Sequence, residues 1–216
     1  MKILFFGDSI TDSSRERGSL ESGRNQETYS IKPRAYGSGF VFLTATQLFY
    51  EKPNYYQILN RGVGGDRLPQ LYARIQLDVW NEKPDVLSIL IGLNDVHTGT
   101  NPNYTDIERW GKIYRTMIRE TQEKCPNTQI IICEPFALLE TRETDEVLKY
   151  AAESKKIANE FGLPFVALQD KMDAVVKIYG VENCCYDGVH PHLVGSKVIA
   201  DAWMDVFKKE VLKSIK

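Results

Sequence analysis

The sequence predicts an α/β domain in which one five-stranded parallel sheet lies between two layers of helices, a three-layer α/β/α sandwich. Short apolar runs bounded by turn-forming residues alternate along the chain with longer stretches of helical periodicity. Four of the five apolar runs are almost continuously apolar, as is typical of parallel strands that are covered on both faces. Such an alternation is normally joined by right-handed crossover connections.

The predicted elements follow one another in a regular order. The apolar runs predict strands at 3–6, 56–59, 86–91, 130–133 and 165–168. Apolar residues at helical spacing predict helices at about 39–50, 69–80, 105–124, 143–161 and 194–212. In a sheet of this kind a ligand binds outside the carboxyl ends of the strands. The loops that follow the strands are therefore the place to look for a functional site.

The length and composition favour a single globular domain over residues 1–216. A chain of 216 residues with 43% hydrophobic and 26% charged residues can bury a continuous core, and no linker or repeat divides it. Lys and Arg number 27 against 29 Asp and Glu, a net charge of -2, so the chain has no basic excess for binding nucleic acid. Self-association into a homo-oligomer is left open.

The N-terminus and the cysteines indicate where the protein works. Only four consecutive apolar residues precede Gly7, too few for the apolar region of a signal peptide or for a membrane span. The four cysteines lack CxxC spacing, so we expect free thiols in a reducing compartment rather than a zinc site. We expect a cytoplasmic protein with no membrane partner. The polar segment 12–38 is too long for a simple connection and is either a functional loop or a surface excursion.

Three polar islands each follow a predicted strand. The first is Gly7-Asp8-Ser9-Ile10, which places Ser9 at the carboxyl end of the first strand, although such residues also form turns and helix caps. The second, 60–66 (NRGVGGD), has glycines that allow backbone N–H groups to point into open space. The third, 92–95 (GLND), could aim the amide of Asn94 at an oxyanion.

The glycine-rich island does not indicate a nucleotide cofactor. A dinucleotide fingerprint would need a further glycine at the position of Arg67, and the chain has no Gly-Lys-Ser or Gly-Lys-Thr of a Walker A motif. The elbow motif GxSxG of α/β-hydrolases is also absent. We therefore expect no cofactor.

A fourth island, 187–191 (DGVHP), precedes the last predicted helix. An Asp three residues before a His can accept the imidazole N–H and leave the other ring nitrogen as a base, which suits a Ser-His-Asp triad. A metal site formed by Asp187, His190 and His192 is the alternative, but these residues lack the additional ligands of common zinc patterns.

Together the four islands resemble those of the SGNH, or GDSL-type, hydrolase family, and the similarity extends from the first strand to the last helix. The family's usual GDSL reads GDSI here. The resemblance implies a flavodoxin-like sheet and a serine esterase that needs no metal. It implies that Ser9 is the nucleophile, His190 the general base and Asp187 the group that orients it. It also implies an oxyanion hole formed by the N–H groups of Ser9 and Gly65 and the side chain of Asn94. Asp8 and Asp95, each next to one of these residues, could brace that hole.

Within this family the sequence is most similar to bacterial acetylxylan esterases and carbohydrate deacetylases. These carry an aromatic residue just before the catalytic Asp, where Tyr186 stands, and we expect its ring to wall off the acyl side of the site. The loops are polar and glycine-rich, with Arg61, Asp66, Arg67 and His97 close by, which favours a small acyl group on a polar alcohol. A lysophospholipase or acyl thioesterase is the competing hypothesis, and a glycan-binding protein without catalysis is a third.

Overall fold

The computed structural model describes residues 1–17, 33–97, 103–138 and 142–213 of the chain. Five strands in this part form one parallel sheet, in the order β2-β1-β3-β4-β5. Their bounds are Lys2–Gly7 for β1, Gln57–Gly62 for β2, Val86–Leu90 for β3, Gln129–Cys133 for β4 and Phe165–Val166 for β5. The strand order turns back on itself at β1, so the crevice beside the carboxyl end of β1 is where a ligand is expected.

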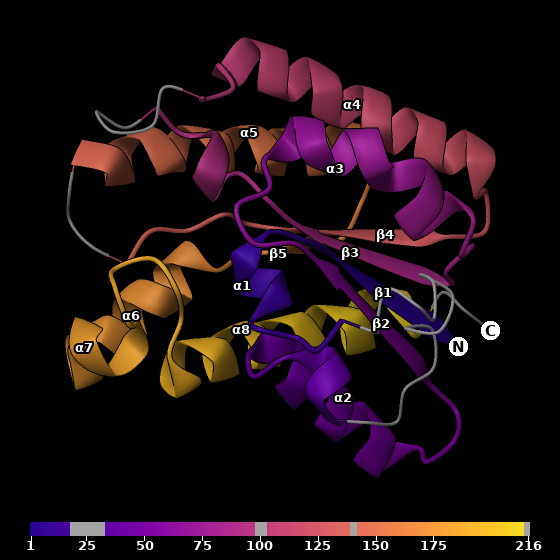
Figure 1. Cartoon of the computed structure of the whole chain (residues 1–216), viewed down its shortest axis with the longest axis horizontal. Helices are drawn as coiled ribbons and strands as arrows, with labels where there is room; N and C mark the ends of the chain where they lie inside the picture. The colour runs from indigo at the N-terminus through magenta and orange to yellow at the C-terminus, as the bar shows by residue number, and fades with distance from the viewer. Residues whose placement is uncertain (18–32, 98–102, 139–141, 214–216) are drawn as a thin grey trace.

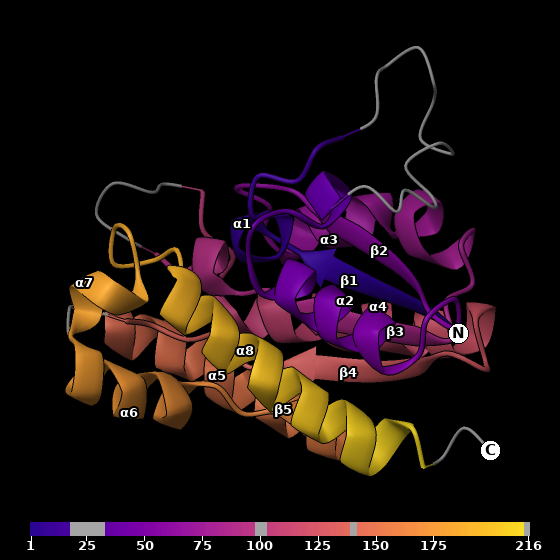
Figure 2. The same ribbon diagram turned by 90° about the horizontal axis from the view of Figure 1, so that it is seen from below.

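Helices cover both faces of the sheet (Figures 1 and 2). One layer contains α3 (Leu68–Ile75), α4 (Ile107–Lys124) and α5 (Arg142–Phe161). The other contains α2 (Phe40–Glu51), α6 (Gln169–Tyr179) and α8 (Leu193–Val206). The short helices α1 (Ser9–Asp12) and α7 (Val181–Cys184), and the single turns η3 (Pro33–Tyr36) and η5 (Leu93–Asp95), lie in the connections. Both α3 and α8 end in a wider turn, η4 (Gln76–Trp80) and η6 (Phe207–Val211).

Two apolar clusters, one on each face of the sheet, form the core. Along β1 the side chains alternate: Ile3 and Phe5 join the cluster under α2 and α8, whereas Leu4 and Phe6 join the one under α3, α4 and α5. All four side chains are fully buried, as expected of a central parallel strand. The predicted three-layer α/β/α sandwich with a five-stranded parallel sheet is confirmed.

Several predicted boundaries are wrong, each for a local reason. The strand predicted at 165–168 stops at Val166, because the N–H groups of Leu168 and Gln169 donate to Glu134 Oε2 at 2.6 and 2.9 Å and start α6. The strand predicted at 86–91 stops at Leu90, since Gly92 turns the chain with φ of +139°. The sequence did not predict α1, α6 or α7. Most of the polar segment 12–38 lies outside the described residues.

No helix in the described part of the chain is long and apolar enough to cross a membrane.

Candidate active site

Ser9 begins α1 directly after β1. The carboxylate of Asp8 caps this helix by accepting the N–H of Ile10 at 3.0 Å, and the Ser9 N–H is among the first-turn donors that a helix leaves unpaired. Gly7 allows the close approach of the neighbouring strand, because a Cβ there would lie 2.4 Å from the carbonyl oxygen of Leu90. Ser9 is thus held at the carboxyl end of the central strand with its own N–H directed away from the helix.

His190 reaches Ser9 from the other end of the chain. Its Nε2 lies 2.8 Å from Ser9 Oγ, and its Nδ1 lies 2.8 Å from Asp187 Oδ2. The other oxygen of Asp187 accepts the backbone N–H groups of Val189 and His190, at 3.1 and 2.8 Å. The structure therefore brings Ser9, His190 and Asp187 into one hydrogen-bonded row, with the histidine in the middle.

The loop that carries Asp187 and His190 is fixed by backbone contacts. Tyr186 N–H donates to the His190 carbonyl at 3.0 Å, and Gly188 N–H donates to Cys185 Sγ at 3.2 Å. Burial alone would raise the pKa of Asp187, but the hydrogen bonds from His190 and Val189 outweigh it and lower this pKa below its ordinary value. Asp187 is therefore ionised at neutral pH and can hold the imidazole in one orientation.

The glycine-rich loop after β2 lies beside the serine. A Cβ on Gly64 would lie 3.9 Å from Ser9 Cβ, and the Gly64 N–H donates to Asp12 Oδ2 at 3.2 Å. Gly65 adopts φ of +80°, and a Cβ there would meet nothing within 4 Å. No hydrogen bond joins the Gly65 N–H to another described residue. Of these two glycines, Gly65 is therefore the one with a backbone donor available to a ligand.

Asn94 stands at the end of the next strand. Its Nδ2 donates to the carbonyl of Asp66 at 3.0 Å, which ties η5 to the glycine-rich loop. The neighbouring Asp95 is fully buried and accepts the Leu68 N–H with both carboxylate oxygens, at 3.0 and 3.2 Å. The Asn94 bond therefore ties the glycine-rich loop to η5, and the Asp95 bonds hold the start of α3, two residues after that loop, against the same turn.

Asp8 and Asp95 are buried carboxyl groups on either side of this site. Burial raises the pKa of Asp8 to about 7 and that of Asp95 to about 6, and each carboxyl accepts backbone N–H bonds that oppose the rise. The charge of Asp95 adds to the effect on Asp8. Both groups are therefore held at a free-energy cost when they are ionised, which is typical of functional sites.

A cavity of about 380 Å³ opens beside Ser9 and His190. Its lining is polar and includes the hydroxyls of Ser13, Ser14 and Ser38. Ser13 and Ser14 adopt φ of +44° and +57°, the left-handed region that residues with a side chain avoid. Tyr186 also lines the cavity, with 68% of the residue exposed and its ring packed on that of His192. The space next to the serine is thus rich in hydroxyl groups.

Other polar residues that the sequence placed near the site bind or pack against residues outside the triad and the oxyanion hole. The buried Arg61 pairs with Glu82 at 2.9 Å, Arg67 bonds to the carbonyl of Asn103, and His97 packs edge-on against Tyr104. His192 Nδ1 accepts the Leu193 N–H and caps α8, so it does not join Asp187 and His190. The described residues contain no group of three or more His, Cys, Asp or Glu side chains that could hold a metal ion.

Arg74, a residue of α3, was not predicted from the sequence as part of the site. It contacts the ends of β1 and β2 as well as Asp66, through hydrogen bonds of 2.7–3.1 Å. No motif marks it, because two of its partners are backbone carbonyls, which every residue has, and the other two are carboxylates of Asp66 and Asp78 that belong to no recognised pattern.

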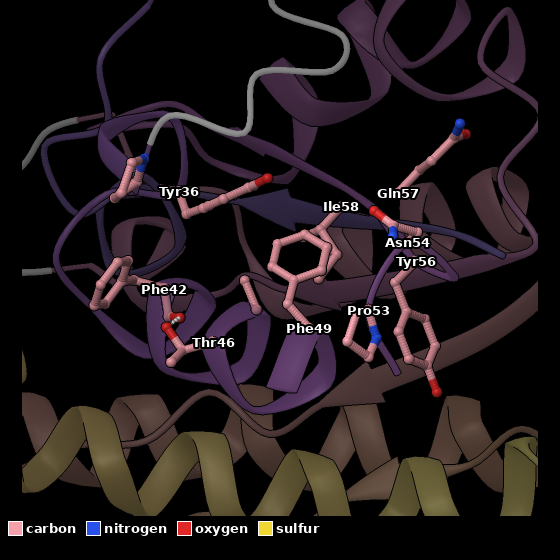
Figure 3. A pocket seen from close by; sticks show the side chains of 11 residues that line it. Tyr36, Phe42, Thr46, Phe49, Pro53, Asn54, Tyr56, Gln57 and Ile58 are labelled. Carbon is pink, nitrogen blue, oxygen red and sulfur yellow. Dashed lines mark hydrogen bonds between the residues drawn. The ribbon is translucent and has the colours of Figure 1, made fainter. Parts of the chain in front are cut away.

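A second cavity, of about 400 Å³, lies between α2 and the start of β2 (Figure 3). Its described lining is mainly apolar and aromatic, including Tyr36, Phe42, Phe49 and Ile58, and contains neither a histidine nor a carboxylate. It shares no described lining residue with the cavity beside Ser9. The chemistry of a hydrolase therefore belongs to the cavity beside Ser9.

The chain is similar to known esterases over nearly its whole length. Residues 5–198 match the model of the GDSL-like lipase/acylhydrolase family. An acetylxylan esterase of Geobacillus stearothermophilus is 30% identical over 213 residues, which cover 94% of this chain and 92% of that protein. A crystal structure of acetylxylan esterase Axe2 from the same organism superposes with a TM-score of 0.85 at 28% identity, covering 97% of this chain and 94% of that one.

A crystal structure described as a GDSL-like lipase from Parabacteroides merdae superposes with a TM-score of 0.86 at 37% identity, covering 96% of this chain and 95% of the other. Structures of Axe2 include catalytic mutants in which a serine, an aspartate or a histidine is replaced by alanine. In that enzyme the aspartate precedes the histidine by three residues, as Asp187 precedes His190. The chain belongs to the GDSL-like lipase/acylhydrolase family and is a carboxylic ester hydrolase.

Proposed function

We propose that the protein is a serine esterase that removes acetyl groups from acetylated carbohydrates, such as xylo-oligosaccharides, through an acyl-enzyme intermediate. The observation that carries the proposal is the row Ser9 Oγ, His190 and Asp187, with 2.8 Å on each side of the imidazole. A serine hydroxyl becomes an effective nucleophile when a base at this distance takes its proton as it attacks.

The reaction would proceed in two halves. Ser9 Oγ attacks the ester carbonyl carbon while its proton passes to His190 Nε2, and the negative charge moves to the carbonyl oxygen. The C–O bond to the alcohol then breaks, and His190 returns the proton to the departing alcohol. Water repeats the sequence on the acetyl-Ser9 ester and releases acetate. Asp187 stays ionised and stabilises the imidazolium in both halves.

Three donors would stabilise the charged oxygen of each tetrahedral intermediate: the N–H groups of Ser9 and Gly65 and the side-chain amide of Asn94. The open space in front of Gly65 and the position of Ser9 at a helix start support the first two. The hydrogen bond of Asn94 to the Asp66 carbonyl supports the third, because it holds the amide beside the glycine-rich loop. In a comparable hydrolase the loss of one such donor lowers the rate by about a hundred- to a thousand-fold.

The polar cavity supports a hydroxyl-rich alcohol as the leaving group. Its serine hydroxyls and the carboxylate of Asp12 can exchange hydrogen bonds with sugar hydroxyls, whereas an alkyl chain would gain little from this lining. The similarity to an acetylxylan esterase supports an acetyl group on a xylan-derived sugar. The ring of Tyr186 lies at the same cavity, where it would limit the acyl chain. Axe2 also has an aromatic residue, a tryptophan, immediately before its aspartate.

The test is an acyl-chain profile followed by acetate release. We expect the specificity constant on aryl esters to fall from acetyl to octanoyl. We also expect the wild type, but not Ser9→Ala, to release acetate from acetylated xylo-oligosaccharides. A profile that rises toward octanoyl would instead favour a lysophospholipase or thioesterase. Binding of the sugar without any turnover would favour the glycan-binding alternative.

A further inference from the structure

We propose that Arg74 is a positioning residue that aligns the three donors of the oxyanion hole, although it neither lines the cavity nor belongs to the triad. The inference rests on the function proposed for Ser9. Arg74 lies on α3, and only 16% of its side chain is exposed. A half-buried guanidinium that binds several backbone carbonyls fixes those carbonyls relative to one another.

The guanidinium of Arg74 joins three segments that carry the site. Its Nη2 donates to the carbonyl of Gly7 at 3.1 Å, two residues before Ser9. Its Nη1 donates to the carbonyl of Arg61 at 2.9 Å, at the end of β2. Its Nε donates to Asp66 Oδ2 at 2.7 Å, directly after Gly65. One planar group thus sets the distance from the end of β1 to the glycine-rich loop.

The third donor is tied to the same group through one further bond. The carbonyl of Asp66 accepts from Asn94 Nδ2 at 3.0 Å, so the residue that Arg74 holds by its side chain also holds the amide of Asn94. Each proposed donor is therefore within two residues or one hydrogen bond of a contact made by Arg74. A displacement of about 1 Å in such a constellation can lower the rate by roughly a hundredfold.

Two other contacts fix the plane of the guanidinium itself. Arg74 stacks over the ring of Phe6 at 4.4 Å and donates from Nη1 to Asp78 Oδ2 at 2.7 Å. A lysine could supply the charge at this position but not the flat, forked set of donors that reaches two carbonyls and two carboxylates. Arg74→Lys is therefore the variant that removes the geometry and keeps the charge.

Arg115 provides a matched control. It lies on α4 in the same helical layer, its side chain is 24% exposed, and its guanidinium binds Glu160 at 2.6 and 2.8 Å and Glu153 at 2.7 Å. These partners belong to α5, not to the loops of the site. Arg115→Lys should lower stability by breaking comparable ion pairs and leave turnover within about twofold of wild type.

The experiment compares kcat, KM and the inhibition constant of an arylboronic acid, which forms a charged tetrahedral adduct on an activated serine. We expect Arg74→Lys to lower kcat on an aryl acetate by ten- to a hundredfold, to leave KM within about threefold, and to weaken boronate inhibition in parallel with kcat. All variants are assayed at a temperature where circular dichroism shows them folded. Asp66→Ala, which removes the acceptor of the Arg74 Nε–H, should change kcat in the same direction by a smaller factor.

A result that would overturn the inference is an Arg74→Lys enzyme whose kcat and boronate affinity match those of Arg115→Lys. If Arg74→Lys does not fold, an Asp66→Ala enzyme with wild-type kcat and boronate affinity would overturn it equally. Failure of the proposed function has a different signature, because the wild type itself would then neither hydrolyse the aryl acetate nor bind the boronate.

Discussion

Replacing Asp8 by asparagine is expected to stabilise the protein by an amount that grows with pH. Asp8 is 1% exposed, and burial raises its pKa from the ordinary 3.8 to about 7. The unfolded chain releases this proton near pH 3.8, whereas the folded protein keeps it until about pH 7. The carboxyl group therefore lowers stability as pH rises through this window, with no cost below the window and the full cost above it. At 1.36 kcal/mol per pKa unit, that cost is about 4 kcal/mol.

The amide introduced by Asp8→Asn would keep an oxygen for the Ile10 N–H but could not ionise. By linkage, the free energy of unfolding of the variant should exceed that of the wild type by about 1 kcal/mol at pH 4.5 and by about 4 kcal/mol at pH 8.5. The new NH₂ group adds an effect that does not depend on pH. That constant effect cancels when the two pH values are compared. The stabilisation by Asp8→Asn should therefore be about 3 kcal/mol larger at pH 8.5 than at pH 4.5. Urea denaturation followed by circular dichroism at both pH values measures this difference.

Asp106→Asn is the control for this experiment. Asp106 also caps a helix, accepting the Arg109 N–H at 2.9 Å at the start of α4, but its side chain is exposed. Asp106→Asn therefore measures what the exchange of a carboxylate for an amide does at a helix cap that is not buried. An Asp8→Asn protein whose change in stability is the same at pH 4.5 and 8.5 would refute the argument that burial holds the proton on Asp8.

Three further outcomes follow from the site. Asp187→Asn should lower kcat on an aryl acetate, measured by stopped assays, by at least a thousandfold, because the amide favours the wrong tautomer of His190. Turnover equal to wild type would assign the orienting role to another group. Tyr186→Ala should flatten a fall of at least tenfold in the specificity constant from acetyl to butyryl esters, because the ring that lines the cavity and packs on His192 leaves less room for a longer acyl chain. An unchanged profile would remove Tyr186 from the acyl side. Activity should survive dialysis against EDTA. A loss that zinc restores would favour the metal site of Asp187, His190 and His192.

The sequence was sufficient to predict the architecture because burial leaves a simple pattern in parallel strands. The runs at β1, β3 and β4 are apolar on both faces, and helices of 8 to 20 residues lie between the strands. Short elements escaped prediction because tertiary contacts start them. The beginning of α6 depends on Glu134, which lies more than 30 residues away and accepts the N–H groups of Leu168 and Gln169.

The residues of the site likewise differ in how far the sequence predicts them. Ser9 and Asn94 follow predicted strands, so topology alone predicts that both lie at the carboxyl edge of the sheet. The place of His190 beside Ser9 was implied by the resemblance to the SGNH family, and the structure brings these two residues together. The residues that support the site and line its cavity could not be predicted from the sequence. Arg74 binds two backbone carbonyls, which every residue has, so its position near the site leaves no mark in the sequence. The hydroxyls of Ser13 and Ser14 line the cavity because the chain adopts left-handed turns after α1.

Covalent labelling of Ser9 tests the central claim most directly. A fluorophosphonate reacts with a serine that a base has activated, so the wild type should gain one adduct by intact mass, and peptide mapping should place it on Ser9. Ser9→Ala should gain none, and His190→Ala should label slower by orders of magnitude while keeping its fold. A wild-type protein that hydrolyses aryl acetates but carries no adduct on Ser9, or a Ser9→Ala protein that labels and turns over at the wild-type rate, would contradict the assignment of Ser9 as nucleophile and His190 as base.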